Sequence, residues 1–302
     1  MTRCISGNMT TIIAGNAAET GYVEGVGEAA RFSALTGFTQ ISPSEVIAAD
    51  AVNHCLRLVD RRTGETQPFV GTCGQEGNAD GAKAQFNMPW SIIKDNQVPD
   101  HLLVADRLND AIRSVLINDK LVSTFANVME KPKNLLQLDN GDVMITSDHE
   151  VTLLSYPLRQ LLPVAGVNDT YGSTDGDFSA TRFFHPAEML KLNKNKLMVA
   201  DKANGKLRVL DLITRQSSTF CTGIPKKCEF FSPRALLLVG DELYVGEEGK
   251  ILRIEREFRK VVSNFNIRFS IFNSVLRLMC LLRGFICHNI LIVFYFNLTQ
   301  PN

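Results

Sequence analysis

Short apolar runs separated by turn-forming residues dominate the first 265 residues of this chain. One stretch shows the pattern clearly, with apolar or alternating runs at residues 90–93, 102–105, 111–116 and 122–125. Such short runs, bounded by Gly, Pro, Asn and Asp, predict β-strands. The second run is apolar throughout, which is typical of a strand covered on both faces, whereas the third alternates as a strand nearer solvent does. The pattern therefore predicts an all-β protein.

The four-run unit recurs along the chain. Three copies, at residues 21–60, 77–113 and 172–208, share a Gly-x-x-Asp/Glu-Gly loop, then Ala-Ala-Asp or Val-Ala-Asp, then Asn and Arg. Two degenerate copies lie at residues 132–166 and 231–254. A period of roughly 40–60 residues is typical of four-stranded propeller blades. We expect a β-propeller with five recognisable blades, on a six-bladed plan whose last blade is incomplete or divergent.

The repeated loop, the Val-Ala-Asp run and the Asn-x-x-Ile/Leu-Arg run resemble the NHL-repeat family. The resemblance covers about residues 10–265, and residues 53–54 hold the Asn-His start of the family signature. The chain looks most like the variety with Gly-Asp-Gly loops, found in multidomain enzymes, bacterial proteins and extracellular proteins. The implied organisation is an N-terminal lead at 1–9, a propeller at 10–265 and a hydrophobic tail at 266–302.

The polar residues that recur in every strong copy have a structural interpretation. An aspartate at the end of the second strand is placed to accept backbone N–H groups of the following turn, and the asparagine suits a left-handed turn position. The arginine on the third strand is placed to pair with a carboxylate. A catalytic residue would not need repeating in each blade, so we expect these positions to be architectural: Asp50, Asp106, Asp201, Asn53, Asn109, Asn204, Arg57, Arg113 and Arg208.

Loops carry function more often than repeated strands do. Three long glycine-rich loops, at residues 16–37, 72–89 and 167–186, are acidic, and shorter loops with Lys131, Lys133, Lys226 and Lys227 predict a basic sector opposite them. One interpretation is a charged face that docks a protein partner. The other is a set of solvated turns. The candidate partner-binding residues are Glu24, Glu28, Glu76, Asp80, Asp175 and Asp177.

Charge and cysteine usage narrow the choice of partner. The chain has 32 Lys and Arg and 32 Asp and Glu, a net charge of zero that argues against a dedicated nucleic-acid binder. Its seven cysteines form no CxxC pair, so we expect no structural zinc. Free thiols fit the scattered positions better than a disulfide framework, with Cys221–Cys228 as the alternative in an oxidising compartment. The 175–177 segment lacks the EF-hand pattern, and we expect no metal or other cofactor.

A non-catalytic binding scaffold is therefore the favoured function, and a propeller-type metal-dependent lyase or hydrolase is the alternative. Peptidyl-amidating lyases, which are propeller relatives, hold zinc with three histidines. The histidines here, at positions 54, 101, 149 and 185, do not occupy equivalent strand positions. No nucleophile–base pair stands out, so we assign no catalytic residue.

The two ends of the chain depart from the repeat. Residues 11–15 match a fourth strand and would complete a last blade, while residues 260–265 match the fourth strand of the fifth unit. The tail beyond has three open interpretations: a gene-model artefact, a membrane segment at 284–298, or a divergent blade. The first 16 residues have no apolar signal region, which slightly favours the cytoplasm. The sequence also leaves open whether the chain is a fragment of a multidomain protein.

Overall fold

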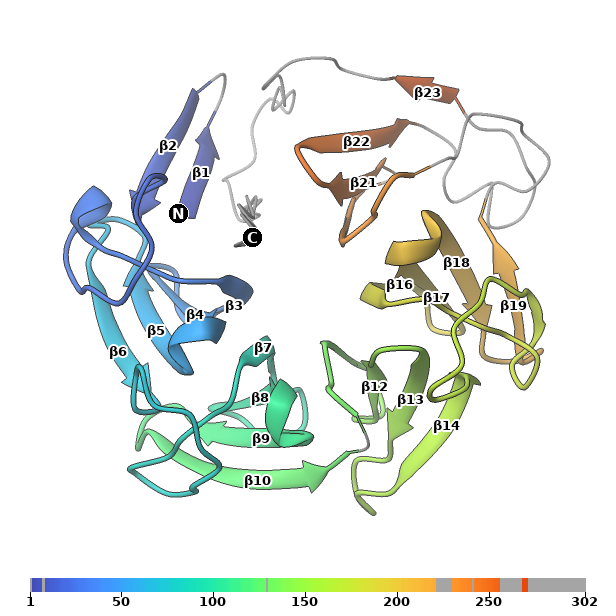
Figure 1. Cartoon of the computed structure of the whole chain (residues 1–302), viewed down its shortest axis with the longest axis horizontal. Helices are drawn as coiled ribbons and strands as arrows, with labels where there is room; N and C mark the ends of the chain where they lie inside the picture. The colour runs from blue at the N-terminus through green and yellow to red at the C-terminus, as the bar shows by residue number, and fades with distance from the viewer. Residues whose placement is uncertain are drawn as a thin grey trace, which may run out of the picture.

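The computed structural model describes residues 2–6, 9–128, 130–220, 230–240, 242–255 and 268–270. Five sheets of antiparallel strands stand around one axis as the blades of a propeller (Figure 1). Each blade has four strands that follow one another in the chain. This confirms the predicted all-β propeller with five recognisable blades.

The strands of the first two blades follow the predicted runs closely. The first blade contains β3 (Leu35–Gln40), β4 (Glu45–Asp50), β5 (Cys55–Asp60) and β6 (Thr66–Val70). The second contains β7 (Pro89–Lys94), β8 (His101–Asp106), β9 (Ala111–Leu116) and β10 (Leu121–Asn127).

The remaining blades keep the same order. The third contains β11 (Asn134–Gln137), β12 (Val143–Thr146), β13 (Glu150–Leu154) and β14 (Leu161–Gly166). The fourth contains β16 (Pro186–Asn193), β17 (Lys196–Asp201), β18 (Lys206–Asp211) and β19 (Gln216–Thr219). The fifth contains β20 (Ala235–Val239), β21 (Glu242–Glu247), β22 (Lys250–Glu255) and β23 (Arg268–Ser270).

The second strand of a blade is apolar throughout because it serves two cores. On β8, Leu102 and Val104 pack into the core shared with the first blade, while Leu103 and Ala105 pack into the core shared with the third. All four side chains have no exposed surface. Alternate residues of a strand point to opposite faces. The second strand of a blade therefore packs one face against the preceding blade and the other face against the following blade.

The long glycine-rich loops run along the outer edges of the blades that follow them. Val26 bridges to Glu65, Gly81 bridges to Val122, and β15 (Gly176–Asp177) adds a short strand beside β19. A fourth strand would otherwise present unpaired N–H and C=O groups at the rim. The loops therefore cover the outer edges of three blades.

The chain ends differ from the sequence expectation. The strand predicted at 11–15 belongs to β2 (Met9–Ala14), which pairs with β1 (Thr2–Ser6) in a two-stranded sheet of its own. In the fifth blade the fourth strand is β23, which pairs with β22; residues 260–265 lie outside the described part of the chain. The candidate membrane segment at 284–298 also lies outside it, and no helix among the described residues is long and apolar enough to cross a bilayer.

The preference for free thiols is wrong for two of the cysteines. Cys55 and Cys73 form a disulfide with their Cα atoms 5.0 Å apart. The bond joins the start of β5 to the beginning of the loop that leads from β6 into the second blade. Disulfides persist mainly in oxidising compartments. Cys221 and Cys228, the pair considered from sequence, lie outside the described residues.

Candidate functional site

Each strong repeat buries an arginine against two carboxylates. In the first blade Arg57 has no exposed surface, and its guanidinium lies 3.0 Å from Asp50 and 2.6 Å from Glu24. Its planar face lies over the ring of Phe32, 4.7 Å from the centroid. The arrangement recurs around Arg113, with Asp106, Asp80 and Phe86, and around Arg208, with Asp201, Asp175 and Phe183.

The aspartate and asparagine of each repeat complete this unit. Asp50 accepts hydrogen bonds from the backbone N–H groups of Ser33 and Ala34 and from the Asn53 side chain, which also donates to the carbonyl of Gly21. Burial raises the pKa of Asp50, and these hydrogen bonds and the charge of Arg57 oppose the rise. Asp106 with Asn109 and Asp201 with Asn204 are arranged alike.

The left-handed turn residue is not the asparagine. Positive φ values fall on the next residue in each repeat, with φ 57° at His54, 49° at Asp110 and 61° at Gly205. The asparagine instead ends a one-turn 3-10 helix, where its side chain bonds both the aspartate and the incoming loop. The sequence therefore located the turn but misplaced its left-handed residue by one position.

The acidic loop residues do not form one surface. Glu24, Asp80 and Asp175 turn toward the buried arginines of their own blades, and Asp80 also accepts hydrogen bonds from Thr124. Burial acts to raise the pKa of Asp80, but the bonds from Thr124 and Arg113 outweigh it and hold the pKa below its usual value. These carboxylates hold the loops on the blades.

The other three candidate residues do not pair with a buried arginine. Asp177 accepts hydrogen bonds from the backbone and hydroxyl of Ser179, which lowers its pKa. Glu28 and Glu76 are exposed in the first two loops. The six candidates come from three loops on three blades.

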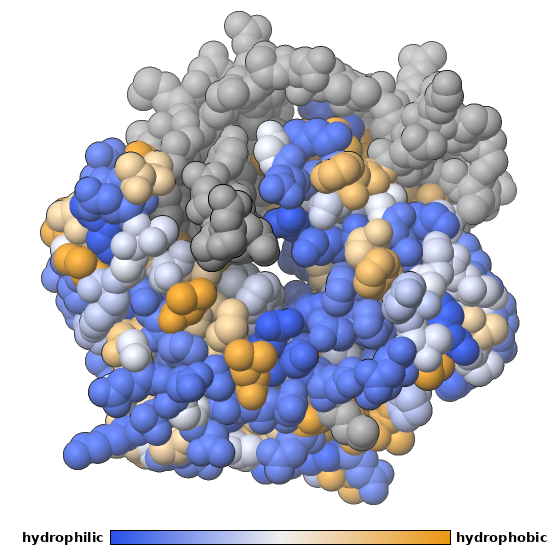
Figure 2. All heavy atoms as spheres, viewed as in Figure 1, coloured by the Kyte–Doolittle hydropathy of each residue, from blue (hydrophilic) through white to orange (hydrophobic). Residues whose placement is uncertain are grey.

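A different group of side chains converges on the loop face. Asp148 follows β12 and lies 2.5 Å from the ammonium of Lys133, 3.5 Å from His185, 3.8 Å from Arg107 and 4.0 Å from Lys131. We call these five residues the Asp148 cluster. They come from the second, third and fourth blades, on the side where second strands lead into third strands. Figure 2 shows that hydrophilic side chains cover much of the lower and right-hand parts of the face it presents, with scattered apolar ones between them.

Positive charge exceeds negative charge in the Asp148 cluster. Lys131, Lys133 and Arg107 surround a single carboxylate. Burial lowers the pKa of Lys133, and the charges of Arg107 and Lys131 lower it further, although Asp148 opposes them. Burial also lowers the pKa of His185, with Lys133 as the next cause. The surrounding cations therefore act on each other as well as on Asp148.

Stacked rings lie beside these charges. Tyr171 stacks on Phe184 at 4.9 Å between centroids, and Phe184 stacks on His185 at 4.9 Å. His149 lies 5.2 Å from His185 and completes the group. Tyr171 is 67% exposed, so an accessible aromatic ring sits next to an excess of positive charge.

The sequence indicated only part of this site. The sequence predicts Lys131 and Lys133 as basic surface residues and raises His185 only as a possible metal ligand; it assigns no role to Arg107, Asp148 or Tyr171. The signal lay in a departure from the repeat: β13 carries no arginine. Asp148 follows the second strand of a blade that lacks the usual partner, and it pairs with cations from neighbouring loops.

The histidines do not build a metal centre in the described part of the chain. His149 and His185 are neighbours, but His54 accepts a hydrogen bond from the Met88 N–H at another blade, and His101 lies on β8. No group of three or more His, Cys, Asp or Glu side chains suited to a metal ion occurs among the described residues.

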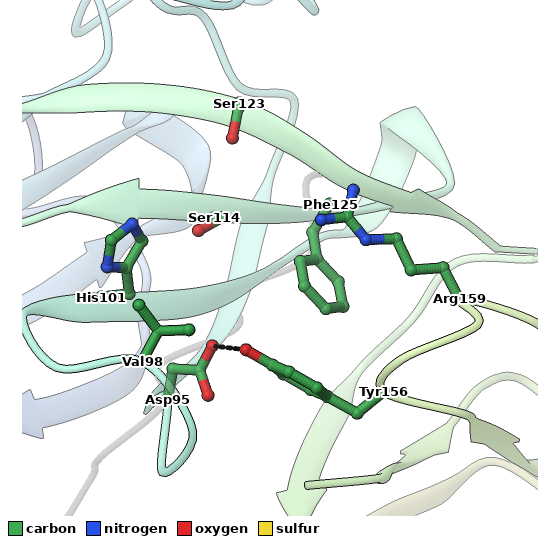
Figure 3. A pocket seen from close by; sticks show the side chains of 8 residues that line it. All are labelled: Asp95, Val98, His101, Ser114, Ser123, Phe125, Tyr156 and Arg159. Carbon is green, nitrogen blue, oxygen red and sulfur yellow. Dashed lines mark hydrogen bonds between the residues drawn. The ribbon is translucent and has the colours of Figure 1, made fainter.

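A small hollow lies on the opposite face of the ring, between the second and third blades. Its volume is about 190 Å³, and it is lined by Asp95, His101, Ser114, Ser123, Phe125, Tyr156 and Arg159, together with Val98 (Figure 3). The Tyr156 hydroxyl donates a 2.8 Å hydrogen bond to Asp95. Burial raises the pKa of Tyr156 to about 12, with this bond as the next cause, so the hydroxyl stays protonated at neutral pH.

Comparison with known proteins identifies the fold. No family profile and no curated protein matches the chain in sequence. It is similar to a chain in the crystal structure of a nidogen/laminin complex, with a TM-score of 0.56 and 10% identity over 84% of this chain and 88% of that one. It is also similar to an auxiliary nutrient binding protein from Bacteroides ovatus, with a TM-score of 0.56, 12% identity and coverage of 71% and 57%.

A third match is virginiamycin B lyase from Staphylococcus aureus, with a TM-score of 0.51 and 12% identity over 74% of this chain and 67% of that one. Identities this low show the fold alone. The matches agree with a propeller of the general type that includes NHL repeats. The assignment to NHL repeats in particular rests on the sequence template.

Proposed function

We propose that this protein is a non-catalytic binding scaffold that docks a protein partner on the loop face, at the Asp148 cluster and the Tyr171 stack. One observation carries the proposal: two lysines and an arginine gather around one carboxylate beside a tyrosine that is 67% exposed. Tyrosine and arginine are the side chains enriched among residues that dominate protein interfaces.

The arrangement favours a partner segment that carries acidic and apolar side chains. Asp148 already neutralises part of the charge of Lys133, but Arg107 and Lys131 lie 3.8 and 4.0 Å from it, too far for good hydrogen bonds. An incoming carboxylate would supply these cations with a closer partner. Complementary charge of this kind raises association rates and selects among partners.

The rest of the loop face supports this role by being rigid. The buried arginine units hold the long loops of three blades through hydrogen bonds and ion pairs. A surface that is ordered before binding loses less conformational entropy when a partner docks. The acidic loops therefore contribute to binding by fixing the scaffold.

A pull-down with immobilised propeller tests the proposal. Lys131 and Tyr171 are exposed, so the double variant Lys131→Glu/Tyr171→Ser should fold as the wild type does. The matched control is Lys194→Glu, a charge reversal in the turn between β16 and β17 on the opposite face. We expect proteins retained by the wild type and the control to be lost from the double variant. Equal retention by all three would overturn the proposal.

A further inference from the structure

The hollow between the second and third blades lies where a serine takes the place of an apolar side chain on the third strand of the second blade. Ser114 follows the buried arginine of β9, and the equivalent residues are Leu58 in the first blade and Val209 in the fourth. Leu58 and Val209 both pack against the core shared with the next blade. Ser123 lies directly opposite Ser114 on β10. Ser114 therefore leaves space where the first and fourth blades place an apolar contact, and the pair adds two hydroxyl groups; the fourth-strand position of Ser123 is polar in those blades as well, as Gln67 and Ser218.

The two serine hydroxyls have no hydrogen-bond partner among the described residues. Figure 3 shows them on adjacent strands, across the hollow from Asp95 and Tyr156. His101 holds its Nδ1 3.0 Å from the carbonyl oxygen of Pro99, which places the proton on Nδ1 and leaves Nε2 as an acceptor. The lining thus offers both donors and acceptors in one small space.

Two opposite charges also line the hollow without neutralising each other. Asp95 accepts hydrogen bonds from Tyr156, Gln137 and the backbone N–H of Gln97, but within the described chain it forms no ion pair. Arg159 lies with its guanidinium 4.6 Å from the centroid of the Phe125 ring, and no described carboxylate pairs with it either. The hollow is therefore lined by one carboxylate, Asp95, and one guanidinium, Arg159, that do not pair with each other.

We propose that this hollow binds a free α-amino acid, with the ligand's ammonium at Asp95 and its carboxylate at Arg159. A zwitterion is the ligand that satisfies both charges together, and the serine hydroxyls and His101 supply the remaining hydrogen bonds. The volume of about 190 Å³ suits one small amino acid. This site lies on the face opposite the proposed docking surface and does not depend on it.

Two tilted aromatic rings lie beside the guanidinium of Arg159. Phe125 and Tyr156 lie 5.4 Å apart between centroids, and Arg159 packs on the outer side of Phe125 at the exposed rim. A guanidinium held against a ring loses less freedom when it binds a carboxylate. Asp95 is buried and fixed by three donors, so both charged ends are positioned before a ligand enters.

Thermal denaturation of the full chain with L-alanine, its N-acetyl derivative and its amide tests this inference. N-acetylation removes the ammonium and amidation removes the carboxylate. For an affinity near ~1 mM, we expect ~10 mM L-alanine to raise the Tm by about 2–5 °C. The two derivatives should each lose most of that shift, because each leaves one wall of the hollow without a charge partner.

Variants of the lining residues distinguish binding in the hollow from a general effect of amino acids on the Tm. Arg159→Gln changes an exposed rim residue, and Ser114→Leu fills the hollow with the side chain that the first blade has there. Both should keep the unliganded fold and abolish the response to L-alanine, whereas Lys194→Glu should keep it. A shift of the same size with the N-acetyl or amide derivative, or in Ser114→Leu, would overturn the proposal. So would the absence of any response to L-alanine, L-serine and glycine in the wild type.

Discussion

At the residue scale, the most constrained side chains are the buried arginines. Arg57, Arg113 and Arg208 have no exposed surface, and each is held by two carboxylates and by backbone carbonyl oxygens. A buried guanidinium is costly unless all its charge is paired. Each arginine joins the second strand, the third strand and the incoming loop of its own blade, so it converts three separate segments into one unit.

Replacing Arg113 with Ala should destabilise the protein by about 3–5 kcal/mol, because Asp106 would stay buried without its cation. Denaturant unfolding measures the change. Arg62 is exposed, and Arg62→Ala, the matched control, should cost less than about 0.5 kcal/mol. A small effect of Arg113→Ala would contradict the structural role of the unit.

The residue scale also shows what the sequence could predict. The repeated Asp, Asn and Arg were recognisable because they recur at fixed spacing. The Asp148 cluster was not recognisable as a site, because it gathers residues from three blades that share no sequence pattern. The Cys55–Cys73 bond was missed because the two cysteines are 18 residues apart and meet only through the pairing of β5 with β6, which sets Leu56 opposite Val70.

At the element scale, the inner strands of adjacent blades are joined by side-chain hydrogen bonds to backbone groups. Ser91 on β7 accepts from the Leu135 N–H of β11, and Asn134 on β11 accepts from the Met189 N–H of β16. Glu188 on β16 accepts from the Leu236 N–H of β20 at 2.8 Å. Sheets in a propeller share no backbone ladder with their neighbours, so these polar contacts add to the apolar cores between blades.

Glu188 makes the contact between the fourth and fifth blades sensitive to pH. Burial raises its pKa to about 7, and the Leu236 N–H only partly opposes the rise. Because the folded-state pKa lies above the ordinary value, the folded state holds the proton more tightly, and stability is lost as pH rises from 4.5 through about 7.

Glu188→Gln should remove this dependence. We expect the variant to match the wild type near pH 5 and to be more stable at pH 8 by about 1–3 kcal/mol, since an amide carries no charge to bury. Thermal denaturation of both proteins across this range measures the difference. A constant stability difference between the two proteins, whatever the pH, would show that Glu188 does not titrate in this window.

At the scale of the whole molecule, the two faces of the ring have different chemistry. The loop face carries the Asp148 cluster and the exposed Tyr171, and the opposite face carries the hollow lined by Asp95 and Arg159. The repeat period predicted the ring itself, because each blade needs a neighbour on both sides to bury its second strand. The chemistry of each face was less predictable, because it depends on residues such as Asp148 and Ser114 that differ from the repeated sequence pattern.

Hydrogen exchange of the propeller with a captured partner tests the central claim, that the loop face is the docking surface. The partner is one retained by the wild type and lost from Lys131→Glu/Tyr171→Ser. We predict that its binding slows exchange in peptides spanning residues 130–133, 148–149 and 171–185, and that the slowing weakens as salt is raised. Protection confined to residues 95–101 and 156–159, on the opposite face, would contradict the account.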